Sequence, residues 1–175
     1  MYRDKIIELL SINQIDSNIF FELVYNTIIS SIFVFICKEI KKKGNKIEEK
    51  ERFRKFENKT IATKCLVSRY LKTNISEEEY QILAQYFNAY FSKDDFRKQF
   101  DKELKSVLIA DQGCKCAICK GNINQNNAHL DHKIAWDYVG DKLLNNYQML
   151  CQTCNDRKSN FVGFELSNIL VRKNN

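Results

Sequence analysis

The sequence has no proline, five glycines, two histidines and one tryptophan in 175 residues. The scarcity of proline and glycine argues against a fold built on many tight turns and favours helices. The start of the chain, MYRDKIIELL, is charged and lacks the small-residue cleavage site of a secretory signal. We therefore expect a cytoplasmic protein, in which seven cysteines indicate metal binding rather than disulfides.

The composition is that of a globular chain, with 44% hydrophobic and 29% charged residues and a formal net charge of +6. It excludes disordered, collagen-like and low-complexity proteins. Lys and Arg are concentrated in residues 38–72, which contain 13 of them and five acidic residues. This stretch is either a solvated helix face or a surface for nucleic-acid phosphates, with Lys41, Lys42 and Lys43 as candidate contacts.

Residues 19–37 are apolar over about the length of a membrane span. Glu22 and several amide and hydroxyl side chains interrupt the run, and a charge inside a span is costly. We therefore expect a helix that is buried in a bundle or in a contact between subunits of an oligomer. A membrane anchor is the minor alternative.

Helical patterns dominate the first two thirds of the chain. They predict helices over 4–15, 16–44, 46–57, 60–72 and 77–91. Ser76 and Glu79 form a capping box for the last of these. A weaker start at Ser92 and Asp95 predicts one more helix, which Gly113 would end.

The character of the sequence changes near residue 105, where aromatic helical faces give way to Cys, Asn, His and Asp. We predict a mainly α protein, with a helical domain over 1–105 and a small α+β module over 106–175 packed against it. The two parts fit the length, which suits one ordinary domain or two small ones.

Two cysteine pairs mark the second part: Cys116-Ala-Ile-Cys119 and Cys151-Gln-Thr-Cys154. Each pair can present two thiolates to one side of a tetrahedral Zn²⁺, and the two pairs together complete a four-cysteine site. Cys114 lies close to the first pair, but only Cys116 has the two-residue gap to Cys119 that this kind of site uses. Zinc would supply folding free energy to a module with few large apolar side chains.

The segment between the pairs holds both histidines, in the run His129-Leu-Asp131-His132, and the second pair leads directly into Asn155. Zinc would hold the ends of this segment together, so Asp131, His132 and Asn155 can meet in space. A single histidine is usually structural. An Asp-His pair, together with an Asn beside a metal ligand, indicates an active site.

This pattern over residues 114–160 resembles the HNH endonucleases of the zinc-knuckle type. The resemblance implies a zinc-stapled ββα-metal fold, with a two-stranded hairpin over about 127–150 and a helix from near Thr153. It also implies that Asp131 and Asn155 hold one catalytic divalent cation and that His132 is the general base.

The resemblance further implies that Asn146 supports the loop that carries the base, or Asn145 if the register shifts by one. Arg157 and Lys158 would approach phosphate from the helix. The family commonly has Pro shortly after the Asp-His pair, where this chain has Lys-Ile-Ala-Trp at 133–136. The family often has Gly-Gly after that, where this chain has only Gly140. Both departures affect the geometry of the loop more than its chemistry. His129 is left with a supporting role.

The residue types suit phosphodiester hydrolysis. A neutral imidazole can take a proton from water near neutral pH. Oxygen ligands such as Asp and Asn suit Mg²⁺ or Mn²⁺ better than zinc. We therefore expect a structural Zn²⁺ in the thiolate site and Mg²⁺ or Mn²⁺ in the catalytic site.

The predicted function is a metal-dependent endonuclease that acts on DNA. By resemblance, its setting is phage defence or restriction, with an ATPase or sensor protein as partner subunit. RNA is the alternative substrate. A non-catalytic zinc module that binds nucleic acid or protein is the alternative function.

Overall fold

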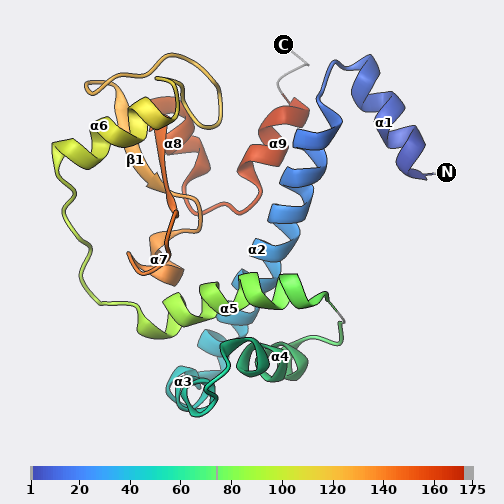
Figure 1. Cartoon of the computed structure of the whole chain (residues 1–175), viewed down its shortest axis with the longest axis vertical. Helices are drawn as coiled ribbons and strands as arrows, with labels where there is room; N and C mark the ends of the chain where they lie inside the picture. Colours follow the sequence, from blue (N-terminus) through green and yellow to red (C-terminus); the bar gives the residue numbers. More distant parts are fainter. Residues whose placement is uncertain (1, 74, 172–175) are drawn as a thin grey trace.

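The computed structural model describes residues 2–73 and 75–171, with a helical part and a small α+β module side by side (Figure 1). The helical part contains α1 (Tyr2–Ile12), α2 (Ser17–Lys43), α3 (Lys46–Lys55), α4 (Lys59–Tyr70) and α5 (Glu77–Ser92). The module contains α6 (Lys102–Asp111), β1 (Ala128–His132), α7 (Trp136–Val139), β2 (Tyr147–Cys151), α8 (Gln152–Lys158) and α9 (Phe164–Val171). The prediction of a mainly α protein with a small α+β module is confirmed.

Helix α2 is the long apolar segment, and it begins and ends where the sequence predicts. The Asp16 side chain accepts hydrogen bonds from the first turn, and Gly44 ends the helix with φ 66°. Within the described residues α2 is the one helix long and apolar enough to cross a membrane, and 28% of its most apolar stretch is buried. Ile19 and Ile28 are about half exposed near its start, and a subunit contact through 19–37 stays a prediction.

The main apolar core is organised around Phe33 of α2, which is fully buried. Its ring lies 5.2 Å from the ring of Phe87 and 6.2 Å from that of Tyr90, both in α5. It also lies 6.1 Å from the ring of Tyr138 in α7. Because α7 belongs to the module, one core continues from the helical part into the module.

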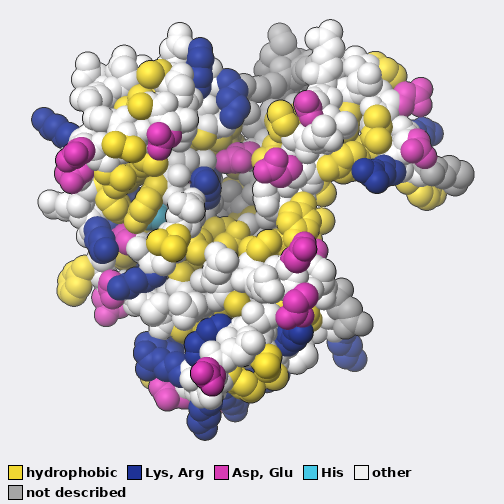
Figure 2. Space-filling view, in the orientation of Figure 1, with side chains coloured by type: hydrophobic (Ala, Val, Ile, Leu, Met, Phe, Trp, Pro, Cys, Tyr) yellow, Lys and Arg dark blue, Asp and Glu magenta, His cyan; other side chains and the backbone are white. Residues whose placement is uncertain are grey.

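A buried carboxylate joins α3 to α4. Glu49 is 1% exposed and receives Arg69 at 2.5 Å, Arg52 at 3.2 Å and the Tyr70 hydroxyl at 3.2 Å. Buried charges are tolerated when they are paired in this way. Arg52 and Arg69 of the basic stretch 38–72 therefore pair with a buried carboxylate, although their side chains are 51% and 35% exposed. Other Lys and Arg side chains gather on the surface over α3 and α4 (Figure 2).

The prediction of a helix start at Ser92 and Asp95 is wrong. Helix α5 ends at Ser92, and α6 begins only after Asp101, whose carboxylate accepts the backbone N–H of Leu104 at 2.8 Å. Residues 93–101 instead run along the outer edge of the molecule from α5 to α6 (Figure 1).

Contacts with the module replace helical hydrogen bonds in this connection. The backbone N–H of Lys98 donates to Asp141 at 3.0 Å. The Phe100 ring packs edge-on against Tyr147, with 4.9 Å between centroids. A segment that lies before the cysteine motif therefore forms part of the surroundings of the hairpin.

Strands β1 and β2 form the predicted hairpin, in a register that pairs Asp131 with Gln148 and His132 with Tyr147. Helix α8 follows β2 without a loop and packs on both strands. The Gln112 side chain, at the end of α6, bonds both the N–H and the carbonyl of Met149 at 2.8 and 3.0 Å. The Gln112 side chain therefore both accepts from and donates to the backbone of β2, as the backbone of a neighbouring strand would.

We expect Phe33→Ala to lower the free energy of unfolding by about 3–5 kcal/mol, because a buried ring would leave a cavity in the shared core. Urea denaturation of the zinc-loaded protein measures the change. Phe96→Ala is the matched control, since Phe96 is 86% exposed and its loss should change stability by less than about 0.5 kcal/mol. Equal stabilities of the two variants would contradict the assigned core.

Candidate active site and metal centre

Four thiols meet where the hairpin joins its flanking segments. The Sγ atoms of Cys116, Cys119, Cys151 and Cys154 all lie within 4.8 Å of one another. The Sγ atoms of Cys119 and Cys151 are 3.7 Å apart. A tetrahedral Zn²⁺ with bonds of about 2.3 Å separates its sulfur ligands by about 3.8 Å. The donor set and the spacing therefore fit zinc, as the sequence predicts.

Backbone donors point at these sulfurs. The N–H of Gly121 lies 3.4 Å from Cys119 Sγ, and the N–H of Cys151 lies 3.4 Å from Cys116 Sγ. Burial raises the pKa of Cys119, but the Gly121 N–H and neighbouring thiols outweigh it and lower this pKa to about 7. Burial raises the pKa of Cys151 and Cys154, so thiolates there need a cation to balance their charge. Cys114 is exposed and lies outside the cluster.

A cavity of about 350 Å³ opens beside the hairpin. Its walls include Asp131, His132 and Asn155, which the sequence predicts as catalytic residues, and also His129. Arg97, from the connection between α5 and α6, lines the same cavity. The hairpin, α8 and the connection between α5 and α6 therefore each contribute residues to one cavity.

Asp131 is held through one of its two carboxylate oxygens. Its Oδ2 accepts the Gln148 amide at 2.8 Å and the Lys158 ammonium at 2.9 Å. The same ammonium donates to the carbonyl of His132 at 2.8 Å. Among residues 2–73 and 75–171, no group hydrogen-bonds Asp131 Oδ1 or the side chain of Asn155, so both retain an oxygen for a cation.

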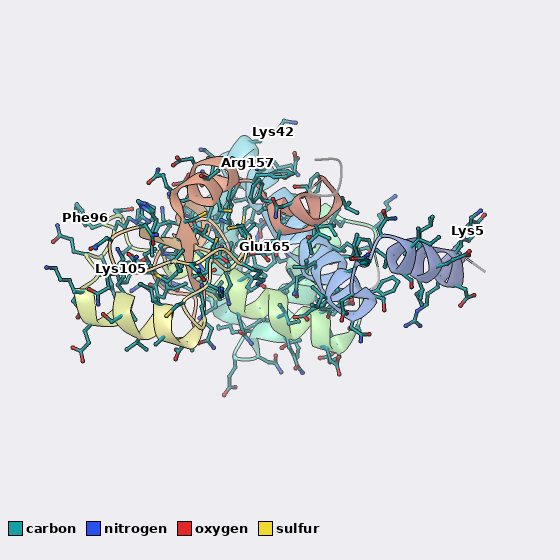
Figure 3. All side chains as sticks on the ribbon, turned by 90° about the horizontal axis from the view of Figure 1, so that it is seen from above. Lys5, Lys42, Phe96, Lys105, Arg157 and Glu165 are labelled. Atoms are coloured by element: carbon teal, nitrogen blue, oxygen red, sulfur yellow. The ribbon has the colours of Figure 1, made fainter. Side chains whose placement is uncertain are left out.

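The two predicted phosphate contacts on α8 lie in different surroundings. Lys158 is 4% exposed and is an internal partner of Asp131, so its ammonium does not lie on the surface where a phosphate would approach. Arg157 is exposed on α8 (Figure 3). Its guanidinium lies 5.6 Å from the centre of the Phe164 ring.

His132 is almost completely buried, with 2% of its side chain exposed. Its Nε2 lies 2.9 Å from Asp141 Oδ1, and the rings of Tyr147 and Phe100 flank it at 4.9 and 6.4 Å. Burial lowers the pKa of His132, and the Asp141 carboxylate offsets part of this effect. The imidazole is therefore neutral near pH 7, the state in which it can accept a proton.

Asp141 receives further donors. Its Oδ2 accepts the Trp136 indole N–H at 3.1 Å and the Lys98 backbone N–H at 3.0 Å, and its Oδ1 lies 3.3 Å from the Tyr147 hydroxyl. Burial raises the pKa of Asp141, but these hydrogen bonds and His132 outweigh it and lower this pKa overall. Burial and the Asp141 carboxylate raise the pKa of Tyr147 to about 12.

Sequence reasoning missed Asp141 and Arg97. Asp141 lies nine positions after His132, beyond a helical turn, and its residue type alone carries no signal. Arg97 lies well before the first cysteine pair and belongs to the connection for which the sequence predicts a helix. Nothing in either local pattern indicates that Asp141 contacts His132 or that Arg97 reaches the cavity.

Asn146 makes the contacts expected of the residue that supports the loop after His132. It is buried and exchanges two hydrogen bonds with the backbone of Ile134, at 2.8 and 2.9 Å. Its own carbonyl accepts the N–H of Lys133 at 2.7 Å. Asn145 is exposed with φ 55°, so it does not share this position.

The predicted lysine contacts lie in the last turn of α2. Lys41, Lys42 and Lys43 are all exposed. Lys42 lies 3.9 Å from Glu39, and the Lys43 ammonium lies 4.7 Å from the centre of the Tyr70 ring. They belong to the end of the molecule formed by α3 and α4, rather than to the walls of the cavity (Figure 1).

Comparison with known proteins agrees with this geometry. Residues 116–161 match the family model described as HNH endonuclease. The match includes all four clustered cysteines, both strands and α8. No curated protein and no solved structure matches the chain.

We expect the purified protein to contain one zinc ion, and Cys151→Ser to lose it, because three thiolates and a hydroxyl bind zinc much more weakly. Metal analysis and the cooperativity of unfolding are the measurements. Cys114→Ser is the matched control and should retain zinc. Full zinc occupancy in Cys151→Ser would exclude Cys151 as a ligand.

Proposed function

We propose that this protein, whose residues 116–161 match the HNH endonuclease model, hydrolyses phosphodiester bonds of DNA with a divalent cation. The supporting observation is the cavity that Asp131, His132 and Asn155 share beside the thiol cluster. A carboxylate and a carboxamide can bind a divalent cation through oxygen, and an imidazole can take a proton from water. The neutral, buried imidazole suits the role of a base.

Asp131 and Asn155 are the residues that would hold the cation. Lys158 and Gln148 occupy Oδ2 of Asp131, so Oδ1 is the oxygen left for binding. Two protein ligands would leave positions for water and for a phosphate oxygen. Mg²⁺ or Mn²⁺ bound there would neutralise charge that develops on the phosphate and on the departing 3′-oxygen.

His132 would take the proton from the attacking water. The water oxygen forms a bond to phosphorus as its proton moves to the imidazole, and the bond from phosphorus to the 3′-oxygen breaks. The leaving oxygen then takes a proton from solvent. Asn146 serves this step at a distance, because its two hydrogen bonds to Ile134 hold the loop that follows the base.

Two exposed arginines are the proposed phosphate contacts. Arg97 is exposed at the wall of the cavity, and Arg157 is exposed on α8. A guanidinium binds a phosphate through two parallel hydrogen bonds, whereas the buried Lys158 serves Asp131. His129 shares the cavity wall and keeps the supporting role that the sequence indicates.

The biological setting is a further part of the proposal. Phage defence or restriction, in the cytoplasm and beside an ATPase or sensor subunit, is supported by the family resemblance alone. The helical part, which lies entirely outside the family match, is the candidate for such a partner contact.

Plasmid cleavage tests the proposed activity. We expect nicking or cutting that requires Mg²⁺ or Mn²⁺, and a loss of at least about 10²-fold in rate for His132→Ala and for Asp131→Ala. Asp156→Ala is the matched control on α8, because its exposed carboxylate contacts Gln152 and not the cavity. Zinc content verifies that each variant is folded.

A wild-type protein that binds DNA but cleaves neither DNA nor RNA with either cation would favour the non-catalytic zinc module. Cleavage of RNA but not DNA would keep the mechanism and change the substrate. Cleavage by His132→Ala at the wild-type rate would remove His132 as the base.

The basic end of the molecule gives a separate prediction. Reversing Lys41, Lys42 and Lys43 to Glu should weaken DNA binding and flatten its dependence on salt, by about one unit of logarithmic slope for each phosphate that the protein no longer neutralises. Fluorescence anisotropy in a salt series without divalent cation measures this. The same reversal at Lys5 on α1 and at Lys102 and Lys105 on α6 is the control. Figure 3 labels Lys5 and Lys105. Equal slopes for both triple variants would return the three lysines to a solvated face.

A further inference from the structure

We propose that Asp141 is a positioning residue, whose carboxylate keeps the proton of neutral His132 on Nε2 and leaves Nδ1 to accept the proton of water. This inference rests on the proposed function, and it adds which ring nitrogen acts and which residue selects it. Asp141 lies inside the family match, but no predicted role included it.

The contact between the two side chains is short and sealed. His132 Nε2 lies 2.9 Å from Asp141 Oδ1, and the side chains are 2% and 3% exposed. A carboxylate only accepts hydrogen bonds, so Nε2 must carry the proton that is donated. Tyr147 and Phe100 flank the imidazole and exclude water from this side.

The other ring nitrogen has different surroundings. Within the described residues, no protein group hydrogen-bonds His132 Nδ1. In the described part of the chain, Asn168 Nδ2 is the one side-chain polar atom that is both fully buried and without a hydrogen-bond partner. His132 Nδ1, which also has no protein partner, is therefore not fully buried. Because His132 lines the cavity, we infer that Nδ1 is the nitrogen in contact with cavity solvent.

The orientation of the Asp141 carboxylate is itself fixed. Its Oδ2 accepts the Trp136 indole N–H and the Lys98 backbone N–H, at 3.1 and 3.0 Å, and neither group can act as an acceptor. The atom that faces these two donors must therefore be an acceptor, which only an oxygen can be. The opposite oxygen, Oδ1, therefore faces His132.

This arrangement makes the effect of one substitution specific. In Asp141→Asn, the amide oxygen would face Trp136 and Lys98, because both are obligatory donors. The amide nitrogen would then point at His132 Nε2 and donate to it. His132 could satisfy this contact only by moving its proton to Nδ1, the nitrogen that has to accept in the reaction.

Nitrogen NMR tests the tautomer without using catalysis. The chain contains only two histidines, so zinc-loaded protein labelled with ¹⁵N at histidine gives two imidazole spectra, and His129→Gln identifies that of His132. Above the titration range we expect protonated Nε2 and unprotonated Nδ1 in the wild type. We expect the reverse in Asp141→Asn.

Cleavage kinetics test the consequence. For Asp141→Asn we expect kcat to fall by about 10²-fold or more with KM unchanged, because substrate binding is intact and the base is in the wrong tautomer. Asp94→Asn is the matched control. It makes the same charge change at a carboxylate that contacts Lys142, next to Asp141 in sequence, and should match the wild type.

The outcomes separate the two proposals. A wild-type His132 protonated on Nδ1, an unchanged tautomer in Asp141→Asn, or wild-type kcat in that variant would each overturn the role of Asp141. An inactive wild type would overturn the proposed nuclease function. The spectra would then still decide whether Asp141 selects the tautomer.

Discussion

The junction of four thiols is the constraint on which the rest of the module depends. A two-stranded hairpin of five residues a side is not stable on its own in water. Cys151 ends β2, and Cys154 directly precedes Asn155 in the first turn of α8. A metal bound by these thiols therefore fixes both the end of the hairpin and the start of the helix. The distance between Asp131 and Asn155 follows from that junction.

The two central polar residues share one design. Asp131 is tied through Oδ2 to a buried ammonium and retains Oδ1, and His132 is tied through Nε2 to a buried carboxylate and retains Nδ1. Charged hydrogen bonds at buried atoms are worth more than those in water, and they hold rotamers firmly. Each residue thus has one atom for support and one for the proposed chemistry.

Features that depend on neighbouring residues could be predicted from the sequence. The caps at Asp16 and Gly44, the capping box at Ser76 and the cysteine spacing all follow from local chemistry, and the structure contains each of them. The connection 93–101 could not be predicted, because its helical pattern competes with contacts made to Asp141 and Tyr147, residues more than 40 positions away. The burial of Lys158 could not be predicted from its local sequence for the same reason, because its partners Asp131 and His132 lie on β1.

Because residues 93–101 contact Asp141 and Tyr147, the segment that matches the family model depends on a part of the chain outside that match. The His132 ring packs near Phe100, and the backbone N–H of Lys98 donates to the Asp141 carboxylate. Both Phe100 and Lys98 lie in the connection that follows α5. Residues 116–161 alone would therefore lack both of these contacts with residues 93–101.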